Sequence, residues 1–171
     1  GNLLWSKTYG GGVHEYGNDV EQTADGGYVI AGYTSSFTIG GNNIYIVKTN
    51  SSGNILWTKS FGGVFGDHAN AIIQTTDGGY AVTGGTDTLG AGITDVFLIK
   101  TDSSGNLLWA KAFGGSVGND VGNSLLQTAD GGYLIAGYTA SFGMGATDFY
   151  LIETDAGGNL LWLKTFGGTG N

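Results

Sequence analysis

The chain of 171 residues contains no cysteine, no proline and no arginine. Without cysteine it can form no disulfide and offers no thiol nucleophile or thiolate metal ligand. Six lysines stand against fourteen acidic residues, which leaves a net charge of −8. Nucleic acids and anionic membranes require a positive surface, so we expect neither of them as a partner. The acidic balance mostly indicates solubility.

Long apolar runs are missing as well. Forty per cent of the residues are hydrophobic, yet no run approaches the ~18 apolar residues that a membrane span requires. The chain begins without a basic and then apolar leader, so we expect any secretion signal to lie outside it. Every periodic run is short and ends at glycine, and we therefore expect no helix.

Glycine, in contrast, is abundant, with 35 residues that recur at fixed positions. The word GNLLW, or GNILW, occurs four times. Its tryptophans are spaced by 52, 52 and 53 residues and are Trp5, Trp57, Trp109 and Trp162. Self-similarity at such a period predicts a tandem-repeat architecture.

Four strands are predicted in each unit. In the first unit they cover residues 19–23, 28–33, 44–49 and the ILWTKSF segment. An Asp-Gly-Gly word separates the first two strands and predicts a hairpin, because glycine tolerates positive φ. The central glycines of these words are Gly26, Gly78 and Gly131. The third strand of the second unit is apolar at consecutive positions, residues 96–99, which is typical of a strand covered on both faces.

Four short strands per unit, with sheets standing between sheets, predict an all-β fold made of β-propeller blades. A β-solenoid is the alternative, but its rungs are usually shorter and it has less need of repeated tight hairpins. We expect three blades of four antiparallel strands, over residues 12–63, 64–115 and 116–171. Residues 1–11 would form an extra outer strand that belongs to no blade of its own.

Three blades are fewer than the ~4 to 8 that close a propeller ring. An open stack would leave an apolar face bare at each end. Two chains could build one ring, the segment could be an excerpt of a longer array, or the extra strand could pair with a neighbour and propagate a filament. We therefore expect other copies of the chain, or further blades, as its partners.

The run GNxLWxKxFGG…TxDGGYxxxGxT…DxxLIKTDxxGN extends over the whole chain. It resembles the repeat of secreted and surface β-propellers of bacteria and archaea. The resemblance implies an extracellular or cell-surface location, and most members of that family have no assigned activity. The first unit departs from the pattern, with Asn42, Asn43 and Asn50 where the later units carry Thr, Asp and Asp.

Two repeated elements predict structural roles. In turns such as DSSGN, the carboxylates of Asp102 and Asp155 can accept hydrogen bonds from backbone N–H groups of the turn. These turns are similar to the aspartate-glycine-tryptophan turns of sialidases and quinoprotein dehydrogenases, where they are structural. On the fourth strand a lysine, Lys59 or Lys111 for example, lies between two aromatic residues on one face. We expect packing between blades with a cation–π contribution of ~0.5–1 kcal/mol; an aromatic platform for sugars is the alternative.

Acidic residues recur in the loops. Glu15, Asp67 and Asp120 follow the fourth-strand segments at equivalent positions, and Asp95 and Asp148 precede the third strands. In a propeller both sets would lie at one end, where a ring of carboxylates could hold a hard cation such as Ca²⁺. Alternatively, each carboxylate fixes a loop of its own or of the next blade, and we then expect no metal site.

Signals for catalysis are weak. His14 and His68 share no register, which makes a poor case for zinc, and no known nucleophile, phosphate-loop or metalloprotease motif is found. A quinone cofactor would want cationic side chains, and the chain has no arginine. We therefore expect no enzyme and no cofactor. We expect a structural or adhesive module that self-associates into a ring, array or filament; the alternative is a lectin-like module that binds glycans at the loop end, with or without Ca²⁺.

Overall fold

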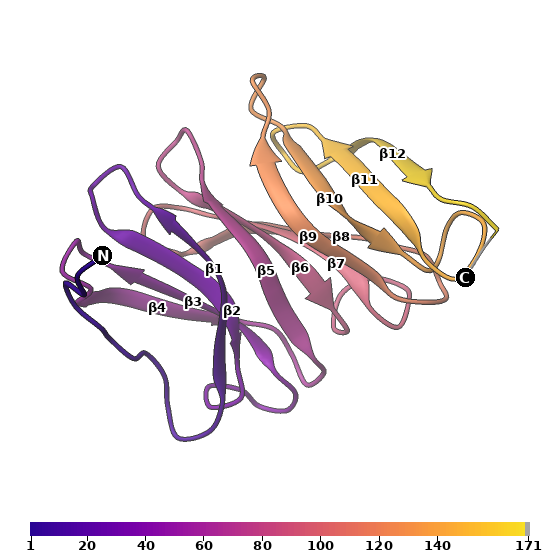
Figure 1. Ribbon diagram of the computed structural model, residues 1–171. Helices are drawn as coiled ribbons and strands as arrows, with labels where there is room; N and C mark the ends of the chain where they lie inside the picture. The colour runs from indigo at the N-terminus through magenta and orange to yellow at the C-terminus, as the bar shows by residue number, and fades with distance from the viewer. Residues whose placement is uncertain (170–171) are drawn as a thin grey trace.

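Three four-stranded antiparallel sheets make up the computed structural model, which describes residues 1–169 (Figure 1). Within each sheet the strands follow one another in chain order. Sheet 1 contains β1 (Glu15–Gln22), β2 (Tyr28–Thr34), β3 (Asn43–Thr49) and β4 (Ile55–Phe61). Sheet 2 contains β5 (Asp67–Gln74), β6 (Tyr80–Thr86), β7 (Asp95–Thr101) and β8 (Leu107–Phe113). Sheet 3 contains β9 (Asp120–Gln127), β10 (Tyr133–Thr139), β11 (Asp148–Thr154) and β12 (Leu160–Phe166).

The Asp-Gly-Gly hairpins join the first two strands of each sheet. In sheet 1 the turn places Gly26 at φ 79°, a left-handed conformation that costs glycine little. Asp25 fixes the turn, because its carboxylate accepts hydrogen bonds from the Thr23 hydroxyl at 2.6 Å and the Gly27 N–H at 2.9 Å. Gly78 and Gly131 take the same conformation, with φ 83° and 88°.

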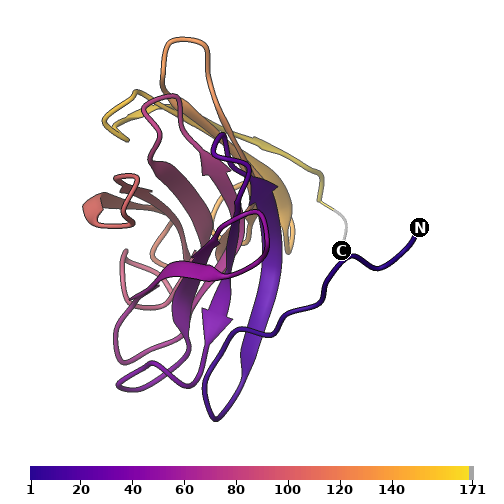
Figure 2. The same cartoon turned by 90° about the vertical axis from the view of Figure 1, so that its left-hand side faces the viewer.

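The sheets stack face to face, and each contact between two sheets holds an apolar core. Between sheets 1 and 2 the core includes Val29, Ile46 and Phe97; between sheets 2 and 3 it includes Leu98 and Ile152. The closest approach is made by first strands: β5 lies against β1, β2 and β3, and β9 lies against β5, β6 and β7. Figures 1 and 2 show the three sheets one after another in chain order.

The prediction of an all-β fold is confirmed. Within residues 1–169 the structure has no helix, and hence none that could span a membrane. The three sheets do not close on themselves into a ring (Figure 1).

One local prediction is wrong. The first strand of sheet 1 begins at Glu15 instead of residue 19, because a β-bulge between Gly17 and Asp19 interrupts the two-residue alternation that marks a strand. Within the single chain, residues 1–11 are in no strand, since no neighbouring strand offers them a hydrogen-bonded ladder; their prediction as an extra outer strand stays a prediction.

Candidate functional site

The most regular feature of the molecule is a contact that the fourth strands β4 and β8 each make with the following sheet. The Trp57 ring meets Tyr80 edge to face, with centroids 5.6 Å apart and planes at 65°. Trp109 and Tyr133 repeat this geometry at 5.8 Å and 70°. Edge-to-face pairs of this kind contribute ~0.5–1.5 kcal/mol beyond the area that they bury.

The lysine of the same strand reaches further along the following sheet. The Lys59 ammonium donates to Asn106 Oδ1 at 3.0 Å, and Lys111 donates to Asn159 Oδ1 at 3.3 Å. Asn106 is itself held by the turn aspartate, since its side-chain amide donates to Asp102 Oδ2 at 2.9 Å. The lysine, the asparagine and the turn therefore act as one unit across the sheet boundary.

The turn aspartates also hold their own backbone. Asp102 Oδ1 accepts from the N–H groups of Ser104 at 2.9 Å and Asn106 at 2.8 Å. Hydrogen bonds from the Asn106 side chain and backbone lower the pKa of Asp102. Asp155 makes the equivalent bonds, with Gly157 N–H at 2.9 Å and Asn159 N–H at 2.8 Å.

Residues 1–11 lie on sheet 1 as a fourth strand lies on its following sheet. Trp5 meets Tyr28 edge to face at 5.9 Å. The Lys7 ammonium donates to Asn54 Oδ1 at 3.0 Å, and the Tyr9 hydroxyl donates to the Gly53 carbonyl at 2.8 Å. Side chains thus fix the position of this segment although its backbone is in no sheet.

The last repeat of the triplet behaves differently. The Lys164 ammonium lies over the ring of its own Trp162, 5.0 Å from the centroid. Among residues 1–169 this is the one cation–π contact; the expectation of such a contact in every unit is wrong, because Lys7, Lys59 and Lys111 reach an asparagine instead.

A second set of contacts between sheets comes from the first strands and was missed from sequence. The Asn18 amide donates to the Ala69 carbonyl at 2.8 Å, and Asn70 donates to the Gly122 carbonyl at 3.0 Å. In the other direction, Gln74 Oε1 accepts from Ala24 N–H at 2.8 Å. Asparagine at the fourth position and glutamine at the eighth recur in all three first strands, and this repetition was the available signal.

Most of the predicted loop carboxylates tie down a loop. Asp67 accepts from the Thr86 and Thr88 hydroxyls and from Gly63 N–H at 3.1 Å. Glu15, which is half-buried, accepts from the Thr34 hydroxyl at 2.9 Å and Gly11 N–H at 3.1 Å. The aspartates of the set are buried, with exposed fractions between 0 and 5%: Asp67, Asp95, Asp120 and Asp148.

The carboxylates form no common ring. Asp95 and Asp120 come together across the boundary of sheets 2 and 3, and Asp67 meets Asn43 across the boundary of sheets 1 and 2. No group of three or more His, Asp or Glu side chains that could hold a metal occurs within residues 1–169. His68 is half-buried, and desolvation lowers its pKa against the opposing effect of Asp87 and Asp67.

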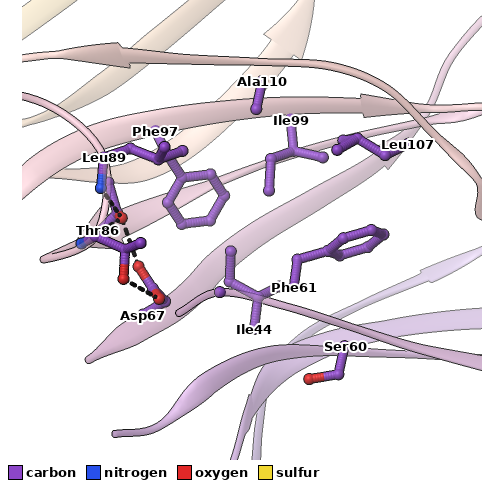
Figure 3. Close-up of a pocket in the computed structure, with 12 residues that line it drawn as sticks. Ile44, Ser60, Phe61, Asp67, Thr86, Leu89, Phe97, Ile99, Leu107 and Ala110 are labelled. Carbon is purple, nitrogen blue, oxygen red and sulfur yellow. Dashed lines mark hydrogen bonds between the residues drawn. The ribbon is translucent and has the colours of Figure 1, made fainter. Parts of the chain in front are cut away.

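Two hollows lie beside Asp67, the first residue of β5. An apolar pocket of about 340 Å³ opens between sheets 1 and 2, where Phe61 faces Phe97 and Ile99, with Asp67 at one end (Figure 3). The oxygens of Asp67 are already bonded to threonines, so this pocket offers little polar chemistry. A more polar groove of about 400 Å³ is lined by Tyr33, Asn42, His68, Asp87 and Thr94, among others.

Comparison with known proteins adds no family. No protein-family model matches the chain, and no curated protein matches it. The repeated contacts between sheets are therefore the feature on which a functional conclusion can rest.

Proposed function

We propose that the chain is a non-enzymatic structural or adhesive module built from propeller-type blades, which belongs to a secreted or cell-surface protein and associates through the faces of its sheets. The observation that carries the proposal is the uncovered face of sheet 3. We call it the outer face and define it by exposed or half-buried side chains of β9, β11 and β12, which are Leu126, Phe149, Leu151, Trp162 and Phe166. Its occupant is a further sheet of the same repeat, supplied in solution by a second copy of the chain.

The outer face repeats the surface with which sheet 2 contacts sheet 3. Where the outer face has Leu126, Phe149 and Phe166, with exposed fractions of 49, 58 and 57%, sheet 2 has Ile73, Val96 and Phe113 in the core it shares with sheet 3. Burying apolar surface is worth ~25 cal/mol per Å², and an exposed apolar patch of this kind is typical of an association site. Continuity with the two existing boundaries favours a sheet of the same kind as its partner.

Light-scattering mass as a function of concentration tests this proposal. We expect the mass to rise above the 17.5 kDa of one chain as concentration increases. Phe149→Lys and Leu126→Lys should each suppress the rise, because a buried ammonium without a partner is costly. Val117→Lys is the matched control: Val117 is 64% exposed but lies in the loop between β8 and β9. A mass of one chain at every concentration would contradict self-association.

Glycan binding is the second candidate, and one observation favours it. The Tyr16 and Tyr33 rings stack at 4.7 Å and 21° beside the polar groove. This aromatic pair occurs once, because the equivalent positions hold His68 and Gly85 in sheet 2. A stacked aromatic surface next to carboxylate and imidazole groups suits a sugar ring and its hydroxyls.

A glycan array with and without chelator would test this candidate. Binding should be lost in Tyr33→Ala and in Asp87→Asn, which lie at the groove. Asp67 and Asp120 are buried, so their substitution would act on the loops rather than on a sugar. Absence of saturable binding to any glycan would remove this candidate and leave the structural module.

A further inference from the structure

Two buried carboxylates meet at the boundary between sheets 2 and 3, where β7 and β9 begin. Asp95 and Asp120 are 1% and 0% exposed. Both flank Gly114: a Cβ added there would collide with Asp95 Oδ1 and lie 2.7 Å from Asp120 Oδ2. Glycine is required at this position, because a side chain would overlap Asp95 Oδ1.

Three of the four carboxylate oxygens of Asp95 and Asp120 accept hydrogen bonds, and the fourth accepts none. Asp120 accepts from the Thr139 hydroxyl on Oδ1 and from Gly115 N–H at 2.9 Å on Oδ2. Asp95 Oδ2 accepts from the N–H groups of Ala91 at 2.7 Å and Gly92 at 3.0 Å. Asp95 Oδ1, the oxygen next to Gly114, is buried and has no partner.

A second oxygen without a partner lies near the same place. The Tyr150 side chain is 1% exposed and its hydroxyl is buried without a hydrogen bond. Its ring packs 5.8 Å from that of Phe142, which in turn lies against Gly115. Burial and then the negative charges of Asp120 and Asp95 raise the pKa of Tyr150 to about 12.

Charge balance calls for a cation here. Burying two carboxylates side by side is costly unless a positive charge compensates them. The ion pairs of residues 1–169 join Lys48 to Asp25 and Lys100 to Asp77, so no lysine compensates Asp95 or Asp120. Carboxylate, hydroxyl and carbonyl oxygens are the ligands that hard divalent cations prefer.

The equivalent place at the boundary between sheets 1 and 2 lacks one of the two carboxylates and the tyrosine hydroxyl. Asn43 stands where sheet 2 has Asp95, and Phe97 stands where sheet 3 has Tyr150. Asp67 is retained, and a Cβ on Gly62 would lie 2.6 Å from both Asn43 Oδ1 and Asp67 Oδ2. The second carboxylate and the hydroxyl are therefore both present at one boundary and both missing at the other, which indicates that they serve one ligand.

We propose that Asp95, Asp120 and Tyr150 bind one divalent cation of the calcium class, which joins sheet 2 to sheet 3. Waters and loop carbonyls complete its coordination, because two carboxylates and a phenol supply fewer oxygens than the 6–8 that Ca²⁺ takes. The cation stabilises the folded chain, since the site is assembled only when the two sheets are packed.

The test compares metal-depleted protein with protein in 1 mM CaCl₂, by thermal unfolding and by titration calorimetry. We expect a higher unfolding midpoint with calcium and a stoichiometry of one ion per chain. Asp95→Asn and Tyr150→Phe, which copy the natural boundary of sheets 1 and 2, should abolish the shift. Asp130→Asn, in an exposed turn, is the matched control and should keep it, which excludes diffuse binding to the acidic surface.

The reciprocal variant keeps the proposal testable if Asp95→Asn fails to fold. Asn43→Asp combined with Phe97→Tyr installs the missing groups at the boundary of sheets 1 and 2, and we expect the stoichiometry to rise to two. Identical unfolding with and without calcium, with no heat of binding, would overturn the proposal. A calcium shift that survives in both Asp95→Asn and Tyr150→Phe would overturn it as well.

Discussion

Sheets 2 and 3 share nearly the same sequence words and differ in how many of their faces are covered. Sheet 2 lies between two sheets, and every residue of its strands β6 and β7 is buried. Sheet 3 is covered on one side, so β11 alternates between buried residues and more exposed ones. Val96 is fully buried, whereas its equivalent Phe149 is 58% exposed.

The contrast shows that the repeated sequence motifs specify the contacts between neighbouring sheets. The tryptophan, the lysine and the first-strand asparagine each contact the following sheet when one is present, as Trp109, Lys111 and Asn70 do. In sheet 3 the same word leaves Lys164 over its own Trp162. Stability in such arrays is approximately a sum of units and nearest-neighbour boundaries, so the same substitution should cost different amounts in the two sheets.

The largest difference is expected for the central leucine of the third strand. Leu98→Ala removes a fully buried side chain from the core between sheets 2 and 3 and should lower the free energy of unfolding by ~2–5 kcal/mol. The equivalent Leu151→Ala acts on a half-buried residue and should cost ~1 kcal/mol or less. Urea denaturation at low protein concentration measures both, and equal losses would mean that the outer face is covered in the single chain.

Truncating the tryptophans should give a smaller difference of the same sign. Trp109→Ala loses the edge-to-face contact with Tyr133 and the packing of Trp109 against the core between sheets 2 and 3, and should cost ~2 kcal/mol. Trp162→Ala should cost ~0.5 kcal/mol in dilute solution. At high concentration the cost of Trp162→Ala should grow if a second copy covers the outer face, whereas a cost that does not depend on concentration would speak against that association.

The loss of folding stability at acid pH should also differ between the sheets. Burial alone would raise the pKa of Asp77, but hydrogen bonds from Thr75, Gly79 N–H and Lys100 outweigh it and lower the pKa to about 2. A folded-state pKa below the unfolded value stabilises the fold above pH ~4, and this contribution is lost as the pH falls toward 2.

Urea midpoints between pH 5 and pH 2.5 check the expectation. Asp77→Asn should reduce the fall of the urea midpoint toward low pH more than Asp130→Asn does. The reason is that the third strand of sheet 3 carries Glu153 where sheet 2 has Lys100. Equal slopes in the two variants would show that Lys100 contributes nothing to this loss of stability at acid pH.

Much of this arrangement could be predicted from local sequence. The hairpins followed from Asp-Gly-Gly, and the run at residues 96–99 indicated a strand covered on both faces; both rest on short-range rules. The start of the first strand could not be predicted, because the bulge near Gly17 hides the alternation. The conformation of residues 1–11 depends on whether a neighbouring strand is available, which no local pattern records.

The candidate site was less accessible to prediction than the fold. The loop carboxylates were identified as equivalent positions, but the stacking of the sheets decides which of them meet. Asp95 meets Asp120 and not Asp148, because the first strand of one sheet lies against the sheet before it. The open oxygen of Asp95 depends on loop backbone geometry, which composition and spacing do not determine.

The smallest expected effect comes from restoring the lysine that sheet 3 lacks. Glu153→Lys places an ammonium where Lys100 stands in sheet 2, and Lys100 reaches Asp77 at 3.0 Å. The new lysine should pair with Asp130 and raise the free energy of unfolding by ~0.5 kcal/mol, since exposed ion pairs contribute little. Glu153→Gln is the control that removes the negative charge without adding a pair. The gain of Glu153→Lys over Glu153→Gln should shrink in 0.5 M salt because screening acts within ~4 Å at that ionic strength; equal stabilities of the two variants in low salt would show that sheet 3 does not form the ion pair of sheet 2.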